Sequence, residues 1–216
     1  MYKKYIKRGL DILLSVVGML PLLPVFLLLV LAIKLDSRGP ILFKQKRVGL
    51  HKETFYVLKF RTMKVETPRD TPTHLLDNPE QWITRTGRFL RKTSLDELPQ
   101  IWNILVGDMS IVGPRPALWN QYDLIEERDK YGANDVLPGL TGWAQINGRD
   151  ELPIPEKAAL DGYYVRNISF KLDFRCLMKT IISVIKSDGV CEGGTRNLQQ
   201  KGEVTTSPMV PEEQKD

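Results

Sequence analysis

A long apolar segment near the N-terminus constrains this chain more than any other feature. The 22 residues from Ile12 to Ile33 include no charged side chain. About 20 apolar residues in a helix cross the hydrocarbon core of a bilayer. The segment is longer than the apolar part of a secretory signal peptide, roughly 7–15 residues, and no small-residue cleavage site follows it. We therefore expect a membrane helix.

Two prolines, Pro21 and Pro24, lie near the middle of this segment. Proline removes a backbone donor and clashes with the preceding turn, although spanning helices tolerate it. Basic residues, which mark the cytoplasmic side, flank both ends. They are Lys3, Lys4, Lys7 and Arg8 before the segment, and Lys34, Arg38, Lys44, Lys46 and Arg47 after it. Two interpretations stay open, a re-entrant helix that bends and returns and a kinked helix that spans; the charges favour the first.

Composition sets the scale of the fold and leaves the function open. The chain has 216 residues, enough for one domain with a sizeable core. Its net charge of +5 suits a nucleic acid, an anionic membrane or a phosphorylated substrate. Two cysteines, Cys176 and Cys191, match no metal-ligand spacing and are too few for a disulfide framework. A reduced domain that faces the cytosol is the simplest interpretation.

Residue patterns predict a short hairpin and several helices. Alternation in residues 41–49 and 54–63 indicates two strands joined near residues 49–51. The predicted helices cover residues 79–92, 99–106, 116–131, 155–166 and 170–187. A polar loop is expected over residues 64–79 and a disordered tail after Glu192. The helix over 79–92 is basic and amphipathic, which fits both a membrane surface and a solvated surface.

Two adjacent carboxylates, Asp96 and Glu97, lie in the run SLDELPQ (94–100). One interpretation is a capping box, with Ser94 as the N-cap and Glu97 three residues later. Pro99 would then fall inside the helix, where an N–H is needed. If Pro99 instead opens the helix, both carboxylates precede its positive end, which favours their ionised forms. An ionised aspartate binds Mg²⁺ or attacks phosphorus to form an acyl phosphate.

Three further runs carry basic residues or glycines suited to phosphate. In GDMSIVGPRP (107–116), Arg115 stands between two prolines that fix its direction, and guanidinium binds phosphate with two donors. The alternative is an exposed arginine in a turn. The run PGLTGWAQINGR (138–149) is rich enough in Gly and Pro to bring backbone amides to an anion, and it ends at Arg149. KFRTM (59–63) adds alternating basic side chains.

In these runs the sequence resembles the monotopic phosphoglycosyl transferases, also called the bacterial sugar transferase family. The resemblance covers about residues 1–190 and rests on four motifs in order after an apolar segment with a central proline. They are KFRTM, SLDELPQ, GDMSIVGPRP and PGLTGWAQINGR. The chain is similar to the small members, which lack the multi-span N-terminal region of the larger ones.

The resemblance implies an α/β fold in three parts. Residues 1–38 would form a re-entrant, broken membrane helix, with the break at Pro24 and a share of that role for Pro21. Leu23 departs from the serine that often precedes this proline in the family. Residues 39–190 would form a compact, mostly helical cytosolic catalytic domain with a short β-hairpin and amphipathic helices at the interface. Residues 191–216 would be a polar, disordered tail.

The resemblance also implies an Mg²⁺-dependent enzyme that moves a sugar-1-phosphate from a UDP-sugar to polyprenol (undecaprenyl) phosphate and releases UMP. Asp96 would attack the β-phosphorus and bind the metal, and Glu97 would act as a base or metal organiser. Phosphate or nucleotide would be bound by Lys59, Arg91, Arg115 and Arg149. This would be the first membrane step of a bacterial glycoconjugate pathway, at the cytoplasmic face of the plasma membrane.

Two rival functions come from other classes. One is a non-catalytic, membrane-anchored binding or scaffold protein of the same fold, against which the intact carboxylates and arginine argue. The other is a nucleic-acid binder that uses the basic helix, which the apolar segment and the lack of a nucleic-acid motif disfavour. Expected partners are the bilayer and the two substrates, without nucleic acid; a second copy of the chain and other pathway enzymes remain to be tested as partners. No residue identifies the sugar.

Overall fold

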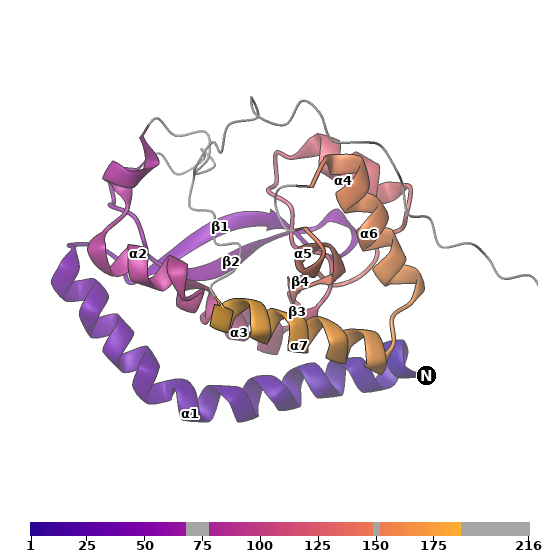
Figure 1. Ribbon diagram of the computed structural model, residues 1–216, viewed down its shortest axis with the longest axis horizontal. Helices are drawn as coiled ribbons and strands as arrows, with labels where there is room; N and C mark the ends of the chain where they lie inside the picture. The colour runs from indigo at the N-terminus through magenta and orange to yellow at the C-terminus, as the bar shows by residue number, and fades with distance from the viewer. Residues whose placement is uncertain (68–77, 149–151, 187–216) are drawn as a thin grey trace, which may run out of the picture.

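The structure is a computed structural model that describes residues 1–67, 78–148 and 152–186. The predicted tail over residues 191–216 therefore lies outside the described residues, as do Arg149 and most of the loop predicted over residues 64–79. Within the described part, a long bent helix lies along one side of an α/β domain (Figure 1).

Helix α1 (Lys7–Asp36) follows a π-helical turn at Tyr2–Ile6 and bends near its middle (Figure 1). Pro21 and Pro24 lie at this middle, where each removes one backbone donor from the helical ladder. The remaining hydrogen bonds keep the helix continuous, so the predicted break at Pro21 and Pro24 is corrected to a bend. The segment Tyr2–Asp36 is long and apolar enough to cross a membrane, judged by length and composition alone.

The two ends of α1 are bound to the domain, whereas its middle is exposed. Near the start, Arg8 donates to the carbonyl of Ile104 at 2.6 Å, and the Asp11 carboxylate accepts a hydrogen bond from Ser110 Oγ at 2.7 Å. Near the end, Leu29 and Ile33 are buried in an apolar cluster. Exposed apolar side chains fill the turns between; they are Val16, Val17, Leu20, Leu23, Leu27 and Leu28.

Two small sheets carry the segments that follow. Strands β1 (Leu42–Val48) and β2 (Thr54–Phe60) form an antiparallel hairpin around a 3-10 turn at Leu50–Lys52, as predicted. Strands β3 (Ser110–Val112) and β4 (Gly139–Thr141) pair in parallel, which the sequence did not predict. Strands of three residues are too short to show a hydrophobic period.

The predicted helices form, with two corrections. The first predicted helix divides into a 3-10 turn at Pro79–Trp82 and α2 (Arg85–Lys92), because Thr84 caps α2 by accepting from the Gly87 N–H. The third shrinks to α4 (Tyr122–Asp129), since the segment before it pairs with β1 through Val48 and Ala117. The other helices are α3 (Gln100–Val106), α5 (Trp143–Ile146), α6 (Ile154–Arg166) and α7 (Phe170–Lys186).

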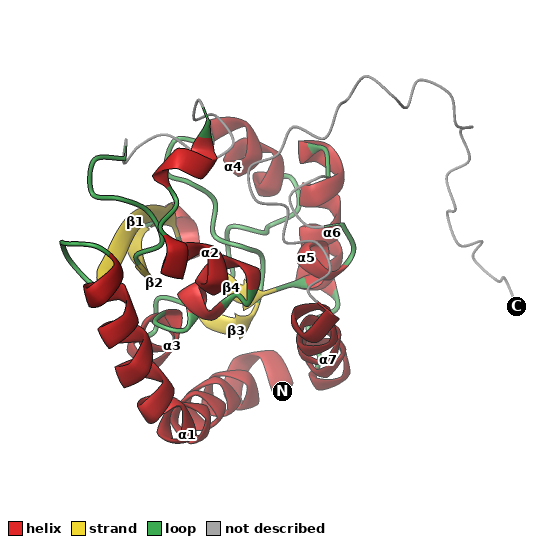
Figure 2. Ribbon diagram, turned by 60° about the vertical axis from the view of Figure 1, so that its left-hand side comes forward, coloured by secondary structure: helices red, strands yellow, loops and turns green. Residues whose placement is uncertain are grey.

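Helix α3 lies between the hairpin and α1 and contacts both β2 and α1. Both views show α3 and α7 beside α1, whereas α4 and α6 lie on the far side of the sheets (Figures 1 and 2). An ion pair of 2.7 Å between Lys7 and Asp173 joins the start of α1 to α7. The short β3–β4 pair lies at the centre, so the segments that leave it are close to both the hairpin and α3.

Candidate active site

Lys59, near the end of β2, approaches both predicted catalytic carboxylates. Its Nζ lies 2.7 Å from Glu97 Oε1 and 4.0 Å from Asp96 Oδ2. All three side chains are largely buried. A lysine amine at this position supplies a positive charge where a phosphate oxygen would approach.

Asp96 and Glu97 belong to a 3-10 turn, Leu95–Glu97, directly before α3. Ser94 precedes this turn in a left-handed conformation with φ 56°, and its side chain makes no capping hydrogen bond. The capping-box interpretation is therefore wrong. Pro99 stands at the N-cap position of α3, where its missing N–H leaves no bond unmade.

Arg115 is positioned by a close crossing of two backbone segments. The Gly113 N–H donates to the Thr141 carbonyl at 2.8 Å, and the Gly139 N–H donates to the Pro114 carbonyl at 2.9 Å. A Cβ atom on Gly139 would lie 2.1 Å from the Gly113 nitrogen, so the crossing requires glycine. The Gly139 amide thus binds the protein itself, and the anion-binding role expected of the run 138–149 remains a prediction for its other amides. The crossing directs Arg115 to Glu97, with 2.9 Å between Nη2 and Oε1.

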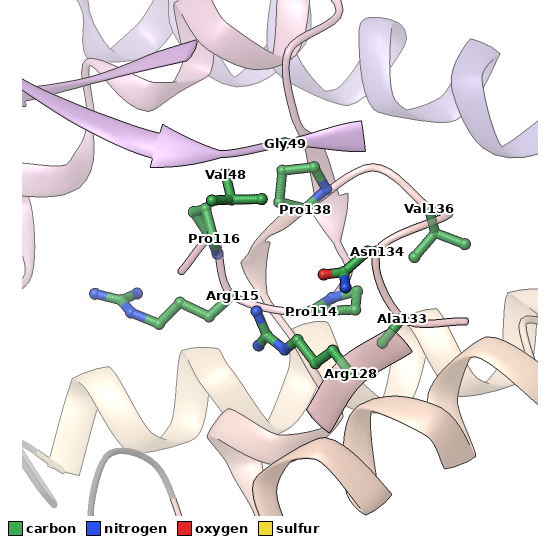
Figure 3. Close-up of a pocket in the computed structure, with 10 residues that line it drawn as sticks. All are labelled: Val48, Gly49, Pro114, Arg115, Pro116, Arg128, Ala133, Asn134, Val136 and Pro138. Atoms are coloured by element: carbon green, nitrogen blue, oxygen red, sulfur yellow. The ribbon is translucent and has the colours of Figure 1, made fainter. Parts of the chain in front are cut away.

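A small cavity adjoins this cluster, and Arg115 is one of its lining residues. Pro114, Arg128 and Asn134 are among its lining residues, and its volume is about 10 Å³, room for about one water molecule. The guanidinium group of Arg115 extends away from Asn134 and Val136 (Figure 3). The cavity is too small for a nucleotide sugar.

The two carboxylates differ in their electrostatics. Burial raises the pKa of Asp96, which the adjacent Glu97 charge reinforces and Lys59 and Arg91 partly offset. Burial would also raise the pKa of Glu97, but Arg115 and Lys59 outweigh it and hold that pKa well below its usual range. Glu97 is therefore a fixed anion. Asp96 lies outside hydrogen-bond distance of Lys59, with 4.0 Å between Lys59 Nζ and Asp96 Oδ2.

Most of the predicted site residues come together. The cluster joins Lys59, Asp96, Glu97 and Arg115, and Arg91 is close enough to influence the Asp96 charge. Arg149 lies outside the described residues. Arg61, the other basic residue of the run 59–63, does not join the cluster. Its guanidinium donates to the Ser37 and Arg38 carbonyls at the end of α1.

The described residues contain no group of three or more His, Cys, Asp or Glu side chains placed to hold a metal ion. Mg²⁺ commonly takes one or two protein carboxylates and completes its shell with water and substrate phosphates, so its binding would not require such a group. Asp96, a carboxylate beside an expected diphosphate, fits such a site.

Sequence reasoning missed Asn103, in the middle of α3. Its side chain is 2% exposed and binds β2, which carries Lys59. Gln100, one turn earlier, is equally buried, whereas Trp102 and Val106 are exposed. The available signal was this inverted pattern, polar residues inside and apolar residues outside, which suits a helix with its outer face on lipid.

A family model described as bacterial sugar transferase matches residues 2–187. The chain belongs to the bacterial sugar transferase family. The match covers the membrane helix, the hairpin, and every described residue of the charged cluster.

Relatives within the family differ in length. The uncharacterized sugar transferase EpsL of Bacillus subtilis is 45% identical over 77% of this chain and 80% of its own length. The exopolysaccharide production protein ExoY of Sinorhizobium fredii is 37% identical over 85% of this chain and 87% of its own. The UDP-glucose:undecaprenyl-phosphate glucose-1-phosphate transferase of Xanthomonas campestris is 40% identical, with 81% of this chain matching 38% of that protein.

Proposed function

We propose that this family member transfers a sugar-1-phosphate from a UDP-sugar to polyprenol (undecaprenyl) phosphate at the cytoplasmic face of the bacterial plasma membrane. The name of the Xanthomonas relative supports the reaction class. The observation that carries the proposal is the contrast within the carboxylate pair. Glu97 is held by two cations, while Asp96 stays outside hydrogen-bond distance of Lys59, among charges that would receive a diphosphate.

The reaction takes two displacements at phosphorus. An Asp96 carboxylate oxygen forms a bond to the β-phosphorus of the donor, and the bond from that phosphorus to the bridging oxygen breaks, so UMP leaves with the electron pair. The sugar phosphate is then joined to Asp96. A phosphate oxygen of the polyprenol phosphate next attacks the same phosphorus, Asp96 leaves as a carboxylate, and polyprenol-diphosphate-sugar is formed.

The surrounding residues organise charge for these steps. Lys59 and Arg115, both held at Glu97, would bind the phosphate oxygens of the substrates. Arg91 and Arg149 are proposed to bind phosphate or nucleotide as well. Bound through Asp96 and substrate oxygens, Mg²⁺ would neutralise part of the diphosphate charge. Because Glu97 is a fixed anion, its role is to orient the two cations and not to accept a proton.

Contacts at both ends of α1 support a re-entrant helix. A straight helix of 30 residues is about 45 Å long, and a span would separate its ends by the whole bilayer. Here Lys7 pairs with Asp173 and, at the other end, Asp36 accepts a hydrogen bond from the Thr86 N–H at 2.8 Å. Both partners belong to one domain, which supports a placement of both ends on the same side of the membrane. The Trp102 side chain on α3, 57% exposed, fits the same interface.

The test is UMP release by purified protein in lipid nanodiscs that contain polyprenol phosphate. The donor panel includes UDP-glucose and UDP-N-acetylgalactosamine, with and without Mg²⁺. We expect Mg²⁺-dependent UMP release with at least one donor, and a loss of at least about 10⁴-fold in Asp96→Asn because the nucleophile is removed. Intact-mass analysis with donor alone should find a phosphosugar on the wild type and none on Asp96→Asn.

The rival is a non-catalytic, membrane-anchored binding or scaffold protein of the same fold. It predicts membrane binding without UMP release from any donor. Undiminished turnover in a folded Asp96→Asn protein would instead show that the protein is an enzyme but that it does not use a covalent intermediate on Asp96.

A further inference from the structure

Asn103 connects the segments that carry the charged cluster. β1 covers one edge of β2. At the other edge, the Leu58 N–H donates to Asn103 Oδ1 at 3.0 Å, and Asn103 Nδ2 donates to the Tyr56 carbonyl at 2.8 Å. The side-chain amide therefore binds the strand as one residue of a third strand would.

This double hydrogen bond fixes the position of β2 along α3. A shift of β2 by one residue would remove both bonds and turn the neighbouring side chains to the opposite face. Lys59 follows Leu58 directly, and its amine lies 2.7 Å from Glu97, in the turn that opens α3. The position of Lys59 at the carboxylate pair thus depends on the contact between β2 and α3.

The same residue orders the turn that leads to β3. The Asn103 carbonyl accepts from the N–H groups of Gly107, Asp108 and Met109 at 3.0–3.2 Å. The Asn103 side chain also donates to Asp108 Oδ2 at 3.2 Å. β3 begins at Ser110, and its far end leads into the glycine crossing before Arg115. One buried asparagine thus contacts the strand with Lys59, the helix behind the carboxylates and the turn into the arginine segment.

We propose that Asn103 is a positioning residue, which sets the register of β2 against α3 and so holds Lys59 at the carboxylate pair. The inference rests on the proposed phosphoglycosyl transfer. Asn103 does not touch the reacting atoms; it acts through Lys59. Displacement of a catalytic group by about 1 Å costs on the order of 10²-fold in rate.

A double-mutant cycle tests this dependence. Asn103→Leu keeps the approximate size and removes the three side-chain hydrogen bonds with Leu58, Tyr56 and Asp108, and Lys59→Met removes the cation. We expect each single change to lower kcat about 30–100-fold while the KM for the donor changes less than about threefold. In the Lys59→Met protein, Asn103→Leu should lower kcat by less than about threefold more, because the group it positions is already absent.

Asn134→Leu is the matched control. Asn134 is also a buried asparagine that donates two hydrogen bonds, to the Ile125 carbonyl and Asp129 Oδ1. It should lower the melting temperature comparably and leave kcat within about twofold. Asn103→Asp, which keeps the acceptor for Leu58 and loses the donor for Tyr56, replaces Asn103→Leu if that protein does not fold.

The outcomes separate two failures. If the loss of kcat in the double variant equals the product of the two single losses, Asn103 and Lys59 act independently. That result would overturn the positioning role. So would a kcat loss in Asn134→Leu equal to that in Asn103→Leu, since general loss of stability would then explain both. Absence of UMP release by the wild type would reject the proposed function itself.

Discussion

Glu97 shares one carboxylate oxygen between an amine and a guanidinium, Lys59 at 2.7 Å and Arg115 at 2.9 Å. A carboxylate that accepts two charge-assisted hydrogen bonds is a poor proton acceptor, since protonation would remove both. The pKa of Glu97 is accordingly held well below its usual range, although burial alone would raise it. In the proposed reaction, its contribution would be the placement of two cations.

Glu97→Gln should therefore lower kcat about 10²–10³-fold, the loss typical of one preorganised electrostatic group. The wild-type-to-variant ratio of UMP-release rates should stay constant from pH 6 to pH 9, because Glu97 remains ionised throughout. A general base that titrates in this range would be protonated in the wild type at low pH, and the ratio would then fall toward one. Such a fall would contradict the fixed-anion role.

Cys176 is an unreactive thiol in the native state. It is completely buried in α7, and burial, aided by the nearby Asp173 charge, raises its pKa to about 12. Alkylation requires the thiolate. In a Cys191→Ser protein, N-ethylmaleimide at pH 8 should react with Cys176 at least about 10³-fold more slowly in buffer than in denaturant. Equal rates would show that α7 opens readily.

At the scale of elements, local patterns predicted the structure and long-range contacts modified it. The hairpin β1–β2 and the helices α6 and α7 form as expected. The helix predicted from residue 116 begins only at Tyr122, because Ala117 pairs with β1. The β3–β4 pair joins residues about 30 apart, which no local pattern reveals.

The candidate site follows the same division. The sequence identified the residue types, because Asp96, Glu97 and Arg115 lie in dense motifs. It did not predict that Glu97 would bind both cations with one oxygen, which depends on how three separate segments pack. Asn103 was missed because polar residues in a short helix normally indicate a solvated face.

A buried ion pair joins α4 to α6. Arg128 Nη2 lies 2.6 Å from Asp161 Oδ2, and the two side chains are 5% and 1% exposed. Burial raises the pKa of Asp161, and Arg128 offsets part of this. Arg128→Met should lower the free energy of unfolding by about 3–5 kcal/mol because it leaves a buried carboxylate unpaired, whereas Arg128→Met with Asp161→Leu should lose far less.

Thermal unfolding in detergent measures the stability of both variants. Lys52→Met is the control, because it removes the exposed ion pair with Asp129 and should cost no more than about 1 kcal/mol. A double variant less stable than Arg128→Met alone would show that the stability loss comes from the missing ion pair and not from the unpaired carboxylate.

At the scale of the whole molecule, α1 is attached at both ends and free in the middle. Arg8 and Asp11 bind the α3–β3 region, and Arg61 donates to the Ser37 carbonyl just beyond the helix. The bend at Pro21 and Pro24 is therefore the part of α1 farthest along the chain from both attachments. In a bilayer, this exposed apolar bend would enter the hydrocarbon, while the attachments would hold the catalytic cluster at the depth of a lipid phosphate.

The topology is tested with single cysteines at either end of α1, Lys3→Cys and Lys44→Cys, each in a Cys191→Ser protein in which buried Cys176 stays unreactive. A membrane-impermeant maleimide should label both positions in inside-out vesicles and neither in sealed right-side-out vesicles. The physical reason is that a span would have to break either the Lys7–Asp173 pair or the Asp36 bond to Thr86. Labelling of the two positions from opposite sides would establish a true span and exclude the re-entrant helix.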